Sequence, residues 1–288
     1  MRELAAGLLS PCPVDPGRLT ADAERGLAAV ARFREQDSSL PGWVNLPLFN
    51  RSGAPDDYTL EAYEGSARET PLCAELPAAA ELVRWVADQG LSVEVARLAV
   101  LEPGSQLRAH VDEYDRLRLI VTLNEDPAFR HVLGDLCVSF QAGELWAVDG
   151  HTCHGAANLH PHRARAALLI DARPESSRLP DWYASCWEVP PARCLSRAPW
   201  DEPARATRLA EARALLEATP TTPELSPAEA HLLSAPYSFE LDHSAAYSSL
   251  VDFCRELAAE HGEPTWSERA EFWEARACRC VPLEAAGA

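Results

Sequence analysis

Two periods of hydrophobic residues alternate along the chain, one helical and one extended. Near the N-terminus Leu27, Val30 and Phe33 recur at helical spacing, with Thr20 upstream as a candidate N-cap. This pattern predicts a first helix that starts at Thr20. Residues 77–90 predict a second helix, with proline at its first position and glycine as its stop signal.

The period becomes extended from Leu91 onward. Short apolar or β-branched runs follow one another, separated by turn residues, and the mixed segment 38–67 is also typical of short strands and loops. Many short strands of this kind predict a β-sandwich or barrel. The predicted strands include Val93 to Val95, Leu98 to Leu101, Leu119 to Leu123, Leu136 to Phe140, Leu145 to Val148 and Ala166 to Ile170.

Helical patterns return in the C-terminal part, after a connector rich in proline and tryptophan that follows Asp171. We therefore expect a β core domain with N-terminal helices over residues 1–200 and a helical C-terminal domain over residues 201–288. The helical signals are the run Ala204 to Ala218, a capping-box pattern at residues 226–229, the spacing of Tyr247, Leu250, Cys254 and Leu257, and the segment Ser267 to Ala277.

Composition and charge narrow the range of partners. The chain is 47% hydrophobic and 24% charged, which is ordinary for a soluble globular protein. Its net charge is −18, and all 26 of its Lys and Arg residues are arginine. A chain this acidic repels phosphate backbones, so nucleic acid is not an expected partner. No apolar run approaches the roughly 18 residues of a membrane span, and the nine cysteines lack a regular spacing. We expect a cytoplasmic protein without a membrane partner.

The candidate chemistry begins with His110 and Asp112. Two residues apart on an extended strand, they share one face. A distant histidine beside them would complete a two-His-one-carboxylate triad, which holds Fe(II) and leaves coordination positions open. His154 is the preferred third ligand, because Asn158 and an arginine follow it, and His151 is the alternative.

Arginines supply the anion-binding candidates. The open iron positions suit dioxygen and a 2-oxo acid, and the distal carboxylate of 2-oxoglutarate in an apolar barrel needs a fixed, charged, bidentate partner. Arg165, at the start of a strand, is our candidate, with Arg163 expected on the same face as the alternative. Arg97 precedes a strand and suits a substrate carboxylate, although a structural salt bridge explains it equally well. Trp146 is expected in the core.

Several short motifs fall together within residues 93–173, namely His110-Val-Asp112, Arg116-Leu-Arg118-Leu, Gly143-Glu-Leu-Trp146, His154-x3-Asn158 and Arg165. Together they resemble the aspartyl/asparaginyl β-hydroxylase-like branch of the Fe(II)/2-oxoglutarate oxygenases, most closely the bacterial L-proline 3-hydroxylase family. The resemblance implies a double-stranded β-helix (jelly-roll) core.

The resemblance also implies roles for single residues. His110, Asp112 and His154 would be the iron ligands, Arg165 would bind the distal carboxylate of 2-oxoglutarate, and Arg118 would lie near the other end of this co-substrate. The sequence departs from the family twice: Ile120 stands where a histidine is common, and Arg165 is one residue further from His154 than usual.

The expected function is therefore Fe(II)/2-oxoglutarate-dependent hydroxylation, with O2, of an unactivated C–H bond in a free L-amino acid, proline or a relative, giving succinate and CO2. Asp112 favours hydroxylation, since related halogenases carry a small residue at this position. The alternatives are the same chemistry on a peptide or carrier-bound amino acid, a non-catalytic barrel that acts as a binding module, and a zinc or cupin-like site. The sequence leaves the oligomeric state open.

Overall fold

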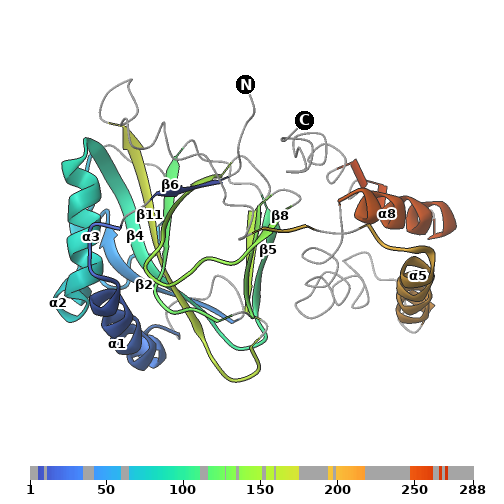
Figure 1. Ribbon diagram of the computed structural model, residues 1–288, viewed down its shortest axis with the longest axis horizontal. Coiled ribbons are helices and arrows are strands. Elements are labelled where there is room, and N and C mark those ends of the chain that lie inside the picture. Colours follow the sequence, from blue (N-terminus) through green and yellow to red (C-terminus); the bar gives the residue numbers. More distant parts are fainter. Residues whose placement is uncertain are drawn as a thin grey trace.

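The computed structural model describes residues 6–9, 12–34, 42–59, 65–110, 116–126, 128–133, 136–150, 154–158, 160–174, 194–196, 199–217, 247–261, 266–267 and 270–271. Within these ranges the protein is mainly antiparallel β-structure with a few helices, which confirms the predicted class (Figure 1).

The strands form two antiparallel sheets. In spatial order, the seven-stranded sheet contains β1 (Ala6–Leu9), β9 (Leu145–Asp149), β6 (Leu117–Thr122), β11 (Arg165–Pro174), β4 (Leu91–Leu101), β2 (Trp43–Asn50) and β3 (Arg68–Glu69). The five-stranded sheet contains β12 (Cys194–Ser196), β8 (Leu136–Val138), β7 (Phe129–Leu133), β10 (His154–Asn158) and β5 (Gln106–His110).

Helices α1 (Pro16–Arg34), α2 (Leu72–Glu75) and α3 (Pro77–Asp88) cover the outer face of the seven-stranded sheet (Figure 1). The main hydrophobic core lies between these helices and the sheet, and it includes Leu19 of α1, Leu82 of α3 and Leu98 of β4. Helix α1 packs closely on the sheet at Gly26, where an added Cβ would clash with a methyl carbon of Leu98.

Two further helices follow the sheets in the sequence. They are α5 (Glu202–Glu217) and α8 (Tyr247–His261), and both confirm predicted helical segments. Arg213 of α5 forms ion pairs with Glu256 and Glu260 of α8, so the two helices are joined by charge as well as by packing. No described helix has the length and apolar content needed to cross a bilayer.

The predicted start of the first helix is wrong. Helix α1 begins at Pro16, because Asp15 serves as the N-cap: its side chain accepts a hydrogen bond from the backbone N–H of Arg18 at 3.0 Å. Thr20 lies inside the helix, where its hydroxyl donates to the carbonyl of Pro16 at 3.0 Å. The second helix is confirmed, and Gly90 follows it with a φ of 79°.

The apolar runs predicted from Leu91 onward all form strands, whereas β1, β3, β7, β10 and β12 were not expected from the sequence. β10 has the sequence His-Gly-Ala-Ala-Asn, which carries no β-branched residue, yet all five residues are buried. It is extended because it pairs with β5 on one side and β7 on the other, a non-local cause. The capping-box pattern at residues 226–229 and most of the expected last helix lie outside the described residues.

Asp22 of α1 supplies a cap that α3 lacks locally. Its fully buried carboxylate accepts a hydrogen bond from the backbone N–H of Ala79 at 2.8 Å and pairs with Arg25. The local N-cap position, Leu76, offers no side-chain acceptor. One carboxylate therefore ties the first turn of α3 to α1.

We predict that Asp22→Ala lowers the free energy of unfolding by about 1–3 kcal/mol, because a buried backbone donor loses its acceptor. Asp22→Asn should have a smaller effect, since its amide oxygen can still accept. Urea denaturation measures both changes, with Glu24→Ala on the exposed face of α1 as the control. Equal midpoints for Asp22→Ala and Glu24→Ala would contradict the capping role.

Candidate functional site

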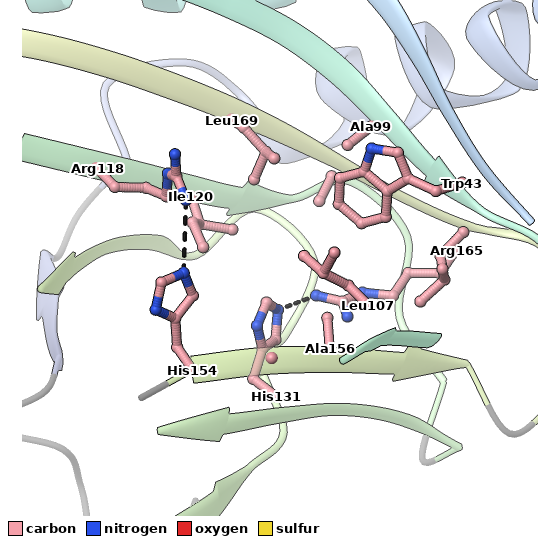
Figure 2. A pocket seen from close by; sticks show the side chains of 13 residues that line it. Trp43, Ala99, Leu107, Arg118, Ile120, His131, His154, Ala156, Arg165 and Leu169 are labelled. Carbon is pink, nitrogen blue, oxygen red and sulfur yellow. Dashed lines mark hydrogen bonds between the residues drawn. The ribbon is translucent and has the colours of Figure 1, made fainter. Parts of the chain in front are cut away.

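A cavity lies between the two sheets, since both contribute residues to its wall (Figure 2). Most of this wall is apolar and includes Trp43, Leu107, Ile120 and Leu169. Its polar side chains are Arg118 and His154 toward one end, and His131 and Arg165 toward the other (Figure 2). The cavity therefore has two polar ends joined by an apolar wall.

His154 occupies one end. It is buried on β10, with 5% of its surface exposed, and its Nε2 atom lies 3.5 Å from Nη1 of Arg118. Its backbone is in direct register with His110 on β5. Directly opposite residues share one face of a sheet, so the fold places positions 110 and 154 side by side.

The other predicted metal ligands lie largely outside the described part of the chain. Asp112 and the alternative ligand His151 lie outside the described residues, and of His110 the structure describes the backbone. Among the side chains that are described, no three His, Cys, Asp or Glu groups are placed to hold a metal ion.

Arg165 occupies the other end and is 3% exposed. Its Nη1 donates to the carbonyl of Arg130 at 3.2 Å, and its Nη2 donates to Nε2 of His131. Among the described residues no carboxylate contacts this guanidinium. Burial lowers the pKa of Arg165 to about 9, so the group remains charged at neutral pH. A buried charge without a counter-ion is costly, which makes this end a strong site for an anion.

Two features direct Arg165 into the cavity. Alternate residues of a strand share a face, and Ala167 and Leu169, which follow Arg165 on β11, also line the cavity. Asn158, fully buried at the end of β10, donates to the carbonyls of Leu101 at 2.9 Å and Arg163 at 2.7 Å. This amide fixes the turn that leads into β11.

Arg163 does not share the position of Arg165. Its side chain is 52% exposed, and its Nη1 lies 2.6 Å from the carboxylate of Asp126. The expectation that both arginines lie on one face is wrong, because β11 begins at Arg165 and the strand alternation does not extend back to Arg163.

His131 of β7 is a cavity residue that the sequence analysis missed. Its ring stacks on Phe140 with a centroid distance of 3.9 Å, and Phe140 stacks on Trp146 at 4.2 Å. Because arginine can only donate, Nε2 of His131 must accept from Arg165, so His131 is neutral with its proton on Nδ1. Trp146 is fully buried, which confirms its expected place in the core.

A signal for His131 does exist in the sequence. Phe129, His131 and Leu133 alternate with other residues at the two-residue period of a strand, and all three are buried. At Ile120, which stands where the resembling family often has a histidine, the cavity wall is apolar. The histidine beside Arg165 comes from the opposite sheet.

Arg97 and Arg118 share one carboxylate. Arg118 binds Asp171 through Nε at 2.7 Å and Nη2 at 3.1 Å, and Nη1 of Arg97 lies 3.5 Å from the same side chain. The structural salt bridge considered for Arg97 is therefore present. Arg97 also lies on the cavity-side face of β4, the face that carries Ala99.

The arrangement suits a small ligand with an acidic group. The buried guanidinium of Arg165 can bind a carboxylate at one end, and an imidazole nitrogen of His154 can bind a metal at the other. The apolar wall between them can enclose a hydrocarbon chain.

Comparison with solved structures gives a weak likeness. A Pseudomonas putida prolyl-4-hydroxylase is 16% identical, with a TM-score of 0.39 over 60% of this chain and 95% of that one. HygX from Streptomyces hygroscopicus, solved with nickel, 2-oxoglutarate and hygromycin B bound, is 14% identical, with a TM-score of 0.37 over 60% of this chain and 87% of that one. TM-scores this low support no conclusion about the family or function of this chain.

Sequence comparison is more informative. L-proline cis-3-hydroxylases 1 and 2 of a Streptomyces species are 30% and 28% identical over 175 residues, which is 57% of this chain. The match spans 59% of the length of each relative. The sequence profile of aspartyl/asparaginyl β-hydroxylase matches residues 19–174, which is more than half of the 288 residues and includes Arg97, Arg118 and Arg165. The resemblance predicted from the motifs is thereby confirmed, and the chain belongs to the aspartyl/asparaginyl β-hydroxylase family.

Proposed function

We propose that the protein is a non-haem Fe(II)- and 2-oxoglutarate-dependent dioxygenase that hydroxylates a free L-amino acid, proline or a relative, and releases succinate and CO2. The observation that carries this proposal is the buried cation Arg165, which faces an apolar cavity and touches no carboxylate among the described residues. An anionic ligand would supply the counter-charge that the described residues do not. Membership of the family and the proline-hydroxylating relatives support the same reading.

His110, Asp112 and His154 are the proposed iron ligands. The donor set fits the metal, because two imidazoles and one carboxylate hold Fe(II) on one face and leave the other face open. His154 is buried beside the cavity, and the strand register sets position 110 opposite it. Bound iron would supply the activation of dioxygen, while the surrounding apolar wall excludes bulk water.

2-Oxoglutarate is proposed to lie along the cavity. Arg165 would bind its distal carboxylate, and His131, as a neutral acceptor, holds one amino group of that guanidinium in place. Arg118 would lie near the other end of the co-substrate, beside His154. Arg97 is the proposed partner of the substrate carboxylate. We assign the anchor to Arg165 and not to Arg163, because Arg163 pairs with Asp126 at the surface.

We also infer the finer architecture. The two antiparallel sheets that enclose the cavity would be the halves of a double-stranded β-helix, and the chain would divide near residue 200 into this core and a helical C-terminal domain. The core assignment agrees with the family match, which ends at residue 174.

The test of this function is succinate formation by protein reconstituted with Fe(II), in air, with 2-oxoglutarate and a panel of free L-amino acids. We expect proline or a related amino acid to stimulate succinate, with a product that gains one oxygen atom. Asp112→Ala should abolish both signals, since it removes an iron ligand. The readouts are the succinate yield and the product mass.

Two other outcomes of this assay are informative. Binding of iron and 2-oxoglutarate without stimulation by any free amino acid would exclude the free substrate and favour a peptide or carrier-bound one. Binding of neither would show that the site assignment is wrong.

We predict that Arg165→Met raises the free energy of unfolding of the ligand-free protein by about 1 kcal/mol, because it removes a buried cation that contacts no carboxylate among the described residues. A ligand that binds only the folded state raises the melting temperature of a protein. We therefore expect 2-oxoglutarate to raise the melting temperature of the wild type but not that of Arg165→Met. Thermal unfolding with and without 2-oxoglutarate measures both effects.

The matched control is Arg163→Met, which removes a surface arginine two residues away. It should keep the wild-type response to 2-oxoglutarate. If 2-oxoglutarate stabilised Arg165→Met as much as the wild type, Arg165 would not be the anchor.

A further inference from the structure

Three neighbouring strands bring Arg97, Asp171 and Arg118 together. β11 lies between β4 and β6 in the seven-stranded sheet. Asp171 is directly opposite Arg118, and Arg97 is in register with Leu169, two residues before Asp171. Leu169 and Arg118 line the cavity, and alternate residues of a strand share a face. The three charged side chains therefore lie on the cavity-side face.

The carboxylate of Asp171 binds one edge of Arg118. The edge consists of Nε, 2.7 Å from Oδ1, and Nη2, 3.1 Å from Oδ2, and Asp171 is 1% exposed. A planar guanidinium held along this edge directs its other amino group away from the acid. That group, Nη1, lies 3.5 Å from Nε2 of His154, the contact drawn in Figure 2.

Arg97 depends on the same acid. Its Nη1 lies 3.5 Å from Oδ2 of Asp171, and its side chain is 9% exposed. One carboxylate therefore orients two guanidiniums that come from the strands on either side of it. Two long, flexible side chains become donors with a fixed direction.

Stability alone does not account for this group of charges. A buried ion cluster is often no more stable than apolar side chains of the same volume. Ile120, Ala167 and Leu169, which continue the same face, are apolar and well buried. Apolar side chains can thus fill this face of the sheet, and packing does not require charged residues at positions 97, 118 and 171. Binding of a ligand explains the three charged residues better.

We infer that Asp171 is a positioning residue that holds Arg118 and Arg97 so that their N–H groups bind a carboxylate at the His154 end of the cavity. This inference rests on the proposed function and adds to it a residue that need not touch the ligand. The carboxylate belongs either to the amino-acid substrate or to the near end of 2-oxoglutarate. Each of the two ligands presents a carboxylate, and the binding experiment distinguishes between them.

The test compares the wild type with Asp171→Asn, which keeps the shape of the side chain but replaces one acceptor oxygen by a donor. Asp126→Asn is the matched control, because it breaks an Arg–Asp pair outside the cavity. Calorimetry without oxygen on the metal-loaded protein measures the affinities for 2-oxoglutarate, for the amino acid that stimulates succinate, and for its carboxamide. Circular dichroism gives the melting temperature.

We expect Asp171→Asn to weaken amino-acid binding by about tenfold or more and to erase the preference for carboxylate over carboxamide, because oriented charge-assisted hydrogen bonds are lost. Asp126→Asn should keep wild-type affinities. If 2-oxoglutarate affinity falls and the preference persists, Asp171 still positions the donors, and the carboxylate is that of 2-oxoglutarate. Unchanged affinities and preference, with or without a lower melting temperature, would overturn the inference.

A second comparison covers the case in which Asp171→Asn does not fold. The double variant Asp171→Asn/Arg118→Gln pairs two amides. It should bind these ligands nearly as Arg118→Gln alone does, because Asp171 contacts Arg118 at 2.7 and 3.1 Å but Arg97 only at 3.5 Å. A further large loss in the double variant would contradict this. Failure of the proposed function is distinct, since in that case the wild type itself binds neither 2-oxoglutarate nor any amino acid.

Discussion

The burial of the Arg165 guanidinium between two sheets is the constraint on which the site depends. A cation in an apolar cavity is unfavourable unless each of its N–H groups finds an acceptor or an anion. Among the described residues Arg165 has a backbone carbonyl and a neutral imidazole as acceptors. The desolvation that makes a buried guanidinium costly also strengthens its attraction for an anion, because electrostatic attraction grows as water is excluded.

The rest of the structure can be understood as support for this cation and for the histidine at the other end. Stacked aromatic rings, Phe140 and Trp146, hold His131 of the five-stranded sheet against the seven-stranded sheet. The amide of Asn158 fixes the turn before Arg165. Helices α1 and α3 cover the far face of the seven-stranded sheet, so its strands are buried on both sides and hold the side chains rigidly.

The sequence predicted the strands with apolar runs and most helices, because those patterns are local. It missed β10, whose extended form comes from pairing with strands far away in the chain. It also missed β7, whose two-residue alternation covers only five residues. The same limit applies to the site. Arg165 and His154 were identified from motifs, but the contact of His131 with Arg165 joins residues 34 positions apart. The partnership of Arg97 with Asp171 spans 74 positions and has no local signal at all.

Strand β11 carries both ends of the proposed ligand site, with Arg165 at its start and Asp171 six residues later. The register irregularity of the strand lies after Asp171, so the intervening segment is regular and spans about 20 Å at roughly 3.3 Å per residue. The spacing between the Cα atoms of Arg165 and Asp171 is thus fixed by the backbone. Divergence toward new substrates would therefore proceed by exchanging the side chains between the ends, Ala167 and Leu169, while the ends themselves stay in place.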